Sequence, residues 1–201
     1  MRAATATLTS DASGITDHAL IVRVAAHGDR HAFSELVKRH QSPLRASLYR
    51  MTGGNRALAD DIAQEAFILA WKNIGKFRFE ARFSTWLYRI AFNAWQSENR
   101  RKTECLLDDE SEDGRENSVM PPPTQAIALH RDLGRAMASL SEAERAAIEQ
   151  CYYNDLSHEE AAYVLNIPLG TLKSHVLRAK EKMRRILQDY SDRSMHQGVA
   201  A

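Results

Sequence analysis

The residues best suited to chemistry in this sequence are the basic ones near its C-terminal end. Between Leu169 and Arg185 there are six basic residues and a single acid, Glu181. The basic residues are Lys173, Arg178, Lys180, Lys182, Arg184 and Arg185. Lysine and arginine neutralise DNA phosphates and match the acceptor atoms on the edge of guanine. The segment therefore indicates contact with nucleic acid, although the solvated face of an ordinary helix can have the same composition.

Apolar residues divide this segment into two faces. Successive residues of a helix are about 100° apart, so four apolar residues fall within about 60° of one another on one side: Leu172, Val176, Ala179 and Met183. We expect this side to pack on preceding helices. The first turns of the opposite side should read base edges, and its later basic residues should bind phosphates. His175, at the edge of the packed side, is expected either to touch a phosphate or to pack. The expected DNA-contacting residues are Thr171, Lys173, Ser174, His175, Leu177, Arg178, Arg184 and Arg185.

Two capping boxes place helices before the basic segment. Ser141 is followed by Glu144, and Ser157 by Glu160, which is the spacing that satisfies the first backbone N–H groups of a helix. The pattern predicts helices over residues 142–153 and 158–165. Asn166-Ile167 forms a tight turn, and Pro168 suits the first turn of a last helix that runs to about Asp189. Two helices joined by so short a turn are typical of a helix-turn-helix, which holds its second helix in the major groove.

Apolar residues at helical spacing also recur throughout the front part of the chain. A helix begins at Thr16 with Leu20, Ile21 and Val24 on one face, and Gly28-Asp29 ends it. Further helices are expected from Phe33 to near Pro43, from Leu44 to the break at Gly53–Asn55, from Ala57 to Lys72, and from a Ser84 cap to the basic cluster Arg100–Lys102.

An abrupt change in composition separates the two helical parts. Residues 104–116 hold seven acids and one base, and three prolines follow at 121–123. Such a segment repels itself and cannot bury apolar surface, so it predicts a flexible linker. We therefore expect an all-α fold of two small helical domains. The expected boundaries are an N-terminal tail at 1–16, a front domain at 17–103, an acidic linker at 104–126, a helix-turn-helix domain at 127–190 and a C-terminal tail at 191–201.

Composition excludes several classes of protein. Cys105 and Cys151 have no cysteine or histidine at ligand spacing, so neither a disulfide framework nor a metal site is expected. No apolar run approaches the ~20 residues that a membrane span needs. The first residues lack the continuous apolar core of a signal peptide. We expect a cytoplasmic protein without a cofactor.

The start of the basic segment resembles a known family. Gly170–His175 and the following Arg178-Ala179-Lys180 are similar to the recognition helix of extracytoplasmic-function (ECF) sigma factors of bacterial RNA polymerase. The family usually has valine at Leu172 and arginine at His175. The resemblance implies that this helix reads the minus-thirty-five promoter element.

Two stretches of the front part resemble the same family. Residues 59–71 are similar to the helix that docks on the polymerase clamp, and the resemblance implies that Asp61, Gln64 and Glu65 contact it. Residues 77–93 look like the segment that recognises the minus-ten element and melts the promoter, with glycine usual at Phe79. Trp86 is expected either to pack or to contact melted DNA. The residues implied for minus-ten recognition and melting are Phe77, Arg78, Phe79, Arg82, Trp86, Arg89, Asn93, Arg100 and Arg101.

The resemblance implies a sigma factor that binds the clamp and flap of core RNA polymerase and both duplex and melted promoter DNA. An anti-sigma factor is a further expected partner. Two other functions are weighed against it. A stand-alone helix-turn-helix regulator would need an apolar sensing pocket in the front part. An enzyme would need more metal ligands than Asp60, Asp61 and Glu65 supply, so we expect no catalytic activity.

Overall fold

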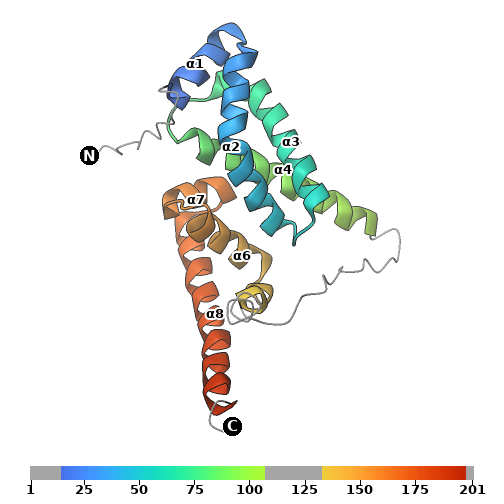
Figure 1. The fold of residues 1–201 in the computed structure, drawn as a ribbon, viewed down its shortest axis with the longest axis vertical. Coiled ribbons are helices and arrows are strands. Elements are labelled where there is room, and N and C mark those ends of the chain that lie inside the picture. Colours follow the sequence, from blue (N-terminus) through green and yellow to red (C-terminus); the bar gives the residue numbers. More distant parts are fainter. Residues whose placement is uncertain (1–14, 107–132, 198–201) are drawn as a thin grey trace, which may run out of the picture. The chain divides into compact units, whose positions relative to one another are not determined.

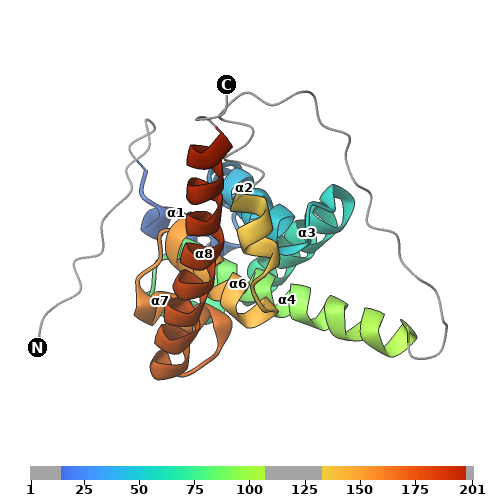
Figure 2. The ribbon, with the colours of Figure 1, turned by 90° about the horizontal axis from the view of Figure 1, so that it is seen from below.

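The computed structural model describes residues 15–106 and 133–197, and every regular element in those two ranges is a helix (Figures 1 and 2). The expected all-α fold is confirmed. The chain divides into two compact units and passes from the first to the second after Arg101. We call the helices up to Leu106 the front unit and the helices from residue 133 onward the rear unit. Most of the expected linker and the first residues of the expected helix-turn-helix domain lie outside the described residues.

The first helix of the front unit has the predicted ends. α1 (Asp17–His27) begins after Thr16, whose hydroxyl accepts a hydrogen bond from the Ala19 N–H at 3.3 Å. Gly28 ends it at φ 61°, a left-handed conformation that glycine adopts without steric cost. Leu20, Ile21 and Val24 are buried, as their spacing predicts.

The predicted break at Pro43 is wrong. α2 (Arg30–Met51) is one continuous helix with Pro43 inside it. A proline within a helix removes a backbone hydrogen bond and costs about 3 kcal/mol. Here Leu36 on one side of the proline and Leu44 and Leu48 on the other are almost fully buried. Because all three pack in the same core, their burial outweighs the local cost.

Glycines and a capping asparagine turn the chain into the next helix. Gly53 and Gly54 have φ of 67° and 93°, and the Asn55 side chain accepts from the Leu58 N–H at 3.0 Å. α3 (Arg56–Asn73) follows and leads into the short helix η1 (Ile74–Lys76). α1 and α3 both pack against α2 (Figures 1 and 2).

The last helix of the front unit is longer than predicted at both ends. α4 spans Phe83–Leu106, so Ser84 is inside its first turn and is not the expected cap. The Trp86 N–H instead donates to the Arg82 carbonyl at 3.1 Å. The helix also continues into the first residues of the expected linker. Neither glycine nor proline interrupts residues 102–106, so an established helix can propagate through them.

The rear unit contains the predicted helix-turn-helix. After a helical stretch at 133–138 come α6 (Glu142–Ile148), the π-helix η2 (Glu149–Tyr153), α7 (His158–Leu165) and α8 (Leu169–Gln197). Both predicted capping boxes are confirmed by reciprocal hydrogen bonds between serine and glutamate. The predicted α-helix over 142–153 widens after Ile148 into the π-helix, where the Asn154 N–H reaches back to the Glu149 carbonyl.

The last helix is also longer than predicted. α8 runs to Gln197 and not only to Asp189, so most of the expected C-terminal tail is helical. Residues 171–197 contain neither glycine nor proline, so the sequence holds no helix-breaking residue there although the apolar periodicity is lost.

A buried carboxylate joins the start of α6 to α8. Glu144 is 4% exposed, accepts the Ser141 N–H at 2.9 Å and binds the Lys182 ammonium at 2.7 Å. These two contacts, the lysine first, lower the pKa of Glu144 to about 2 against an opposing effect of burial. A lowered pKa means that the charged carboxylate stabilises the fold above its ordinary pKa of 4.5.

This contact predicts a pH-dependent stability. Glu144→Gln should lower the thermal unfolding temperature at pH 7, and the deficit should shrink as the pH falls from 4.5 toward 2, where wild-type Glu144 becomes protonated. Circular dichroism melts of the full chain at several pH values measure this. Glu142→Gln, an exposed acid in the same turn, is the matched control. An equal deficit at pH 7 and pH 3 would contradict the assignment.

Candidate nucleic-acid interface

The structure confirms the two faces of the basic helix. Leu172 and Ala179 are fully buried in α8, and Val176 is 4% exposed. Ala179 belongs to an apolar cluster with Leu140 and Ile148. The exposed residues among those expected to contact DNA are Thr171, Lys173, Ser174, Leu177, Arg178, Arg184 and Arg185. The core of the rear unit therefore directs these side chains to solvent.

Two of the six basic residues contact other helices of the rear unit. The Lys180 ammonium lies 4.9 Å from the centre of the Tyr152 ring, and Lys182 binds Glu144. Neither is among the residues expected to contact DNA. The remaining four, Lys173, Arg178, Arg184 and Arg185, are exposed and give the surface its positive charge. A single-sign patch of this kind attracts the phosphate backbone.

His175 lies beside Arg178, one turn along the helix. Its Nδ1 is 3.1 Å from Nη2 of Arg178, and its side chain is half-buried. When Nδ1 is unprotonated it accepts a hydrogen bond from the guanidinium and orients it. The Ser174 hydroxyl donates to the Gly170 carbonyl at 3.0 Å, which leaves its oxygen able to accept a further hydrogen bond.

The turn before α8 has the conformation that a helix-turn-helix needs. Asn166 has φ 54°, a left-handed value that asparagine tolerates better than most residues. The Ile167 N–H donates to the Ala162 carbonyl at 3.1 Å, which closes the end of α7. The Leu172 N–H donates to the Pro168 carbonyl at 3.0 Å and so starts α8. The exposed first turns of α8 can therefore enter a major groove.

Aromatic residues form a continuous cluster in the front unit. The Phe77 ring centre lies 4.9 Å from that of Phe79, 5.2 Å from Trp86 and 6.2 Å from Phe83. Phe83 and Trp86 are 5.8 Å apart. We call Phe77, Phe79, Phe83 and Trp86 the aromatic cluster. It brings together residues of the predicted melting segment from the loop and from the start of α4.

Exposure increases across the aromatic cluster from its core side to its surface. Phe83 is 4% exposed, Phe77 and Trp86 are half-buried, and Phe79 is 45% exposed. Phe79 has φ 57°, and a left-handed conformation costs a bulky residue about 1 kcal/mol or more. Trp86 thus packs in the cluster and remains partly exposed. The exposed ring of Phe79 offers a stacking surface that the core supports.

Polar residues of the predicted melting segment flank this cluster and continue along α4. Arg78 and Arg82 are exposed beside Phe77 and Phe79. Further along the helix, Trp86, Arg89, Asn93 and Arg100 recur at helical spacing and so share one face. Asn93, Arg100 and Arg101 are exposed. Aromatic rings with neighbouring cations suit single-stranded nucleic acid, because rings stack on bases while cations hold the backbone.

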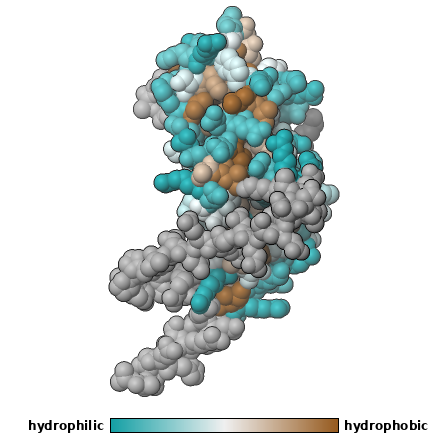
Figure 3. Space-filling view, turned by 90° about the vertical axis from the view of Figure 1, so that its right-hand side faces the viewer, coloured by the Kyte–Doolittle hydropathy of each residue, from teal (hydrophilic) through white to brown (hydrophobic). Residues whose placement is uncertain are grey.

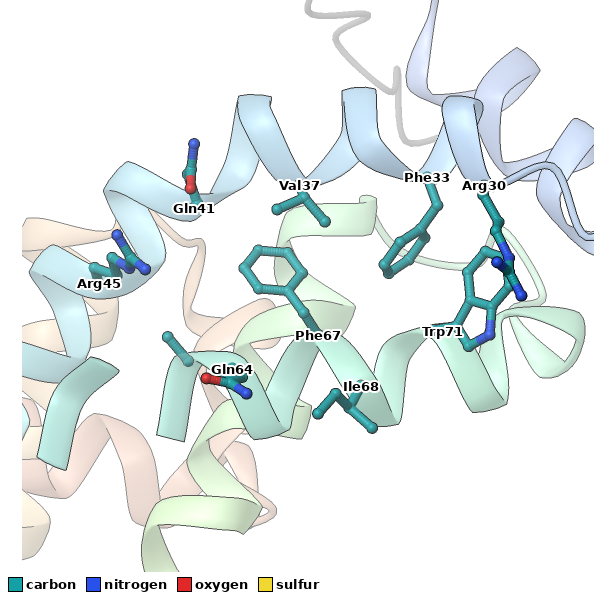
Figure 4. Close-up of a pocket in the computed structure, with 10 residues that line it drawn as sticks. Arg30, Phe33, Val37, Gln41, Arg45, Gln64, Phe67, Ile68 and Trp71 are labelled. Atoms are coloured by element: carbon teal, nitrogen blue, oxygen red, sulfur yellow. The ribbon is translucent and has the colours of Figure 1, made fainter. Parts of the chain in front are cut away.

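An apolar groove between α2 and α3 was not predicted from the sequence. It has a volume of about 570 Å³, and its walls include Phe33 and Val37 from α2 and Phe67, Ile68 and Trp71 from α3 (Figure 4). Phe33 and Trp71 meet edge to face at 5.0 Å. Ile68 is 46% exposed, and Figure 3 shows apolar surface among hydrophilic side chains on the side where α3 lies in Figure 1. Phe67, Ile68 and Trp71 are apolar but are not among the buried residues of α3, so the sequence places apolar side chains off the buried face without showing that a groove forms.

Polar residues border this groove along α3. Gln64 lines it, and Asp61 and Glu65 are exposed nearby on the same helix. Asp60 is instead bound to Arg45 of α2 at 3.2 Å. The structure therefore places the three residues expected to bind the polymerase on an exposed edge, next to apolar surface that can bury a partner's side chains.

A second apolar groove lies in the rear unit between η2 and α8. Its volume is about 720 Å³, and its walls include Ile148, Tyr152, Met183 and Leu187. Tyr152 and Tyr153 are both exposed at its side. Tyr152, Met183 and Leu187 thus line an apolar groove that is open to solvent.

The described residues show no arrangement suited to metal or thiol chemistry. Within them, no group of three or more histidines, cysteines, aspartates or glutamates could hold a metal ion. Burial raises the pKa of the Cys151 thiol and outweighs the opposing charge of Lys180. No helix of the described part is long and apolar enough to cross a membrane.

Comparison with known proteins identifies the family. The family described as Sigma-70 region 2 matches residues 36–104, and that described as Sigma-70, region 4 matches residues 130–183. The chain is 34% identical to the ECF RNA polymerase sigma factor SigW of Bacillus subtilis (strain 168) over 84% of its own length and 95% of that protein. The chain belongs to the ECF sigma factor family. This ECF sigma factor has a role in transcription initiation.

A further relative and two solved structures are also similar to this sigma factor. It is 33% identical to the ECF RNA polymerase sigma-E factor of Escherichia coli (strain K12) over 83% of this chain and 92% of that one. The solved structure of CnrH in complex with the cytosolic domain of CnrY has a TM-score of 0.63 at 25% identity, covering 86% of this chain and 97% of that one. The sigma factor RpoE in complex with the anti-sigma factor NepR from Bartonella quintana shares the fold, with a TM-score of 0.66 and 24% identity over 78% of this chain and 96% of that one.

The two matched regions contain most of the surfaces described above. Region 2 includes the groove between α2 and α3 from Val37 onward and the whole aromatic cluster. Region 4 includes α8 as far as Met183. α1 precedes the region 2 match altogether.

The two faces of α8 predict that substituting a buried and an exposed leucine changes stability by different amounts. Leu172→Ala should destabilise the rear unit by about 2–5 kcal/mol, because it removes a fully buried side chain. Leu177→Ala should change stability by less than about 0.5 kcal/mol, since Leu177 is 60% exposed. Urea unfolding of the full chain followed by circular dichroism measures both, and equal effects would show that the helix is rotated.

Proposed function

We propose that this sigma factor binds core RNA polymerase, captures melted minus-ten DNA with its front unit and reads the minus-thirty-five element with its rear unit. The observation that carries the proposal is the exposed basic face of α8, which lies opposite the buried Leu172, Val176 and Ala179. The front unit contributes the aromatic cluster and the groove between α2 and α3.

In the rear unit, the first exposed turns of α8 enter the major groove of duplex DNA. Lys173 and Arg178 match guanine acceptors, and the Ser174 hydroxyl can serve more than one base. His175 orients Arg178, and the exposed apolar Leu177 can contact a thymine methyl group. Thr171, Arg184 and Arg185 bind the phosphate backbone and hold the helix in register.

In the front unit, melted DNA meets the aromatic cluster and its arginines. Once a base leaves the stack, at a cost of a few kcal/mol, an aromatic surface can capture it. Phe79 and the partly exposed Trp86 provide that surface, and Phe77 contacts both rings. Arg78 and Arg82 lie beside the stacked base. The face of α4 that carries Arg89, Asn93 and Arg100 follows the strand, and Arg101 lies beside Arg100 in the same turn.

Polymerase docks on both grooves. An amphipathic helix of the clamp fits the groove between α2 and α3, where its apolar side chains meet Phe67 and Ile68 and its basic ones meet Asp61 and Glu65. Gln64 provides a hydrogen bond at the same edge. The groove beside Tyr152 and Met183 accepts the flap.

The polymerase carries out the chemistry, and the sigma factor supplies recognition. Each unit alone binds weakly, but the expected linker keeps both near their promoter elements and raises the effective concentration of the second contact. An anti-sigma factor is a further proposed partner, because the similar RpoE was solved in complex with one.

Polymerase binding depends on α3 in this proposal. Asp61→Ala or Gln64→Ala should reduce retention of the full chain on immobilised core polymerase by roughly tenfold. The first variant removes a charged contact of the proposed interface, and the second removes a neutral hydrogen bond. Glu35→Ala, which removes an acid paired with Lys38 at 2.8 Å, is the control.

Run-off transcription of the wild-type chain with core polymerase on a promoter library tests the function as a whole. A wild type that confers no start-site choice would overturn it.

Substitutions at different positions of α8 should distinguish residues that read bases from residues that bind phosphates. In the holoenzyme, Arg178→Ala should weaken discrimination at one position of the upstream element by about 1–3 kcal/mol. Arg184→Ala combined with Arg185→Ala should lower affinity on all sequences alike and flatten the salt dependence. Promoter-library selection at two salt concentrations measures both effects. Unchanged sequence preference in Arg178→Ala would remove that residue from base reading.

A further inference from the structure

The first turn of α1 contacts the aromatic cluster directly. The His18 ring centre lies 4.4 Å from that of Phe79, with an angle of 39° between the planes. Phe79 is the cluster's most exposed ring and has the left-handed φ of 57°. Two rings hold it in place: Phe77 from the loop itself and His18 from α1. The position of Phe79 therefore depends on a helix distant from it in the sequence.

The neighbouring residue of α1 contacts the cluster through a second route. Asp17 accepts hydrogen bonds from Nη1 of Arg39 at 2.9 Å and from Nε2 of His40 at 2.7 Å. The His40 ring centre lies 5.1 Å from that of Phe83, the buried end of the cluster. The carboxylate thus connects α1 to α2, and the imidazole connects α2 to the start of α4.

This second route is partly shielded from solvent. The side chains of Asp17, Arg39 and His40 are 21%, 11% and 15% exposed. Burial raises the pKa of Asp17, but the hydrogen bonds and charges of His40 and Arg39 outweigh it, and the pKa lies below its usual value. A shielded ion pair with short hydrogen bonds fixes geometry more firmly than an exposed one.

The anchoring of α1 does not require these polar contacts. Leu20, Ile21 and Val24 bury its apolar face at 2–3% exposure, which holds the helix against the unit. Asp17 and His18 lie one turn earlier. The His18 ring touches Phe79 of the loop, and Asp17 reaches Phe83 of α4 only through His40. Neither lines the groove between α2 and α3. The two residues can therefore influence the aromatic cluster without altering the surface proposed to bind the polymerase.

We propose that Asp17 and His18 are positioning residues for promoter opening, which hold the two ends of the aromatic cluster in the arrangement that captures an unpaired base. This inference rests on the proposed function of the cluster. His18 fixes the exposed ring of Phe79, and Asp17 fixes Phe83 through His40. Capture then requires little reordering of the protein, which lowers the barrier to stable strand separation.

Opening kinetics of the holoenzyme test the first contact. His18→Ala should slow opening of a duplex promoter, followed by 2-aminopurine fluorescence in the minus-ten element, by about two- to tenfold, the range expected for one ring contact. His18→Phe, which keeps a ring at this position, should restore most of the rate. His27→Ala, an exposed histidine in the last turn of the same helix, is the matched control.

A promoter whose minus-ten strands are unpaired from the start separates positioning from other roles. On this template His18→Ala should initiate at close to the wild-type rate, and its retention on immobilised core polymerase should equal that of the wild type. An equal defect on both templates, or a loss of polymerase binding, would overturn the proposal, because either result indicates general damage to the front unit.

A double-mutant cycle tests the second contact. Asp17→Asn and His40→Gln should each slow duplex opening, and the double variant should be no slower than the slower single one if both act along one route. Glu35→Gln is the control for loss of a paired carboxylate. Additive effects, or no effect of either variant, would contradict the proposal. If the wild-type holoenzyme opens no promoter, the proposed function itself fails. If the wild type opens promoters and these variants open them equally fast, only the positioning role of Asp17 and His18 fails.

Discussion

The burial of one stripe of α8 is the constraint on which the rear unit depends. Leu172 and Ala179 are fully buried and Val176 nearly so. Because successive residues of a helix are about 100° apart, a rotation by one position would bury Lys173 and expose Leu172. Such a rotation loses apolar burial and removes a charge from water at the same time. The direction of Arg178 is therefore set by the core, and the sigma factor presents its basic face without reordering.

The front unit uses a related constraint in its aromatic cluster. Exposure rises from 4% at Phe83 to 45% at Phe79, and Phe77 and Trp86 connect these two ends. A ring at the surface is thereby joined through ring contacts to a ring in the core. Side chains that are ordered before binding lose less conformational entropy when a partner arrives. In the proposed function the same residues both pack and contact DNA, and this is why sequence alone left Trp86 open between the two.

Sequence predicted the elements governed by local chemistry and missed those governed by packing. Both capping boxes, the Gly28 end of α1 and the two faces of α8 follow from residue types at fixed spacing, and all are present. Pro43 did not end its helix, because long-range burial on both sides of it exceeds a local cost. The groove between α2 and α3 could not be predicted, since it depends on how two helices pair. The roles assigned to Asp61, Gln64 and Glu65 remain predictions that their exposure supports.

Both grooves and both surfaces proposed to contact DNA are modest in extent, and this bears on how this sigma factor would select a promoter. A groove of about 570 Å³ with one polar edge accepts a few side chains of a partner helix, which gives moderate affinity on its own. The same holds for four exposed basic residues on α8, whose attraction to phosphates is the same on any sequence. In the proposed arrangement, selectivity arises only when several such contacts form together, because each tethered contact raises the effective concentration of the next. A promoter that satisfies one unit and not the other loses the whole of that gain, so discrimination between promoters exceeds what either unit could achieve alone.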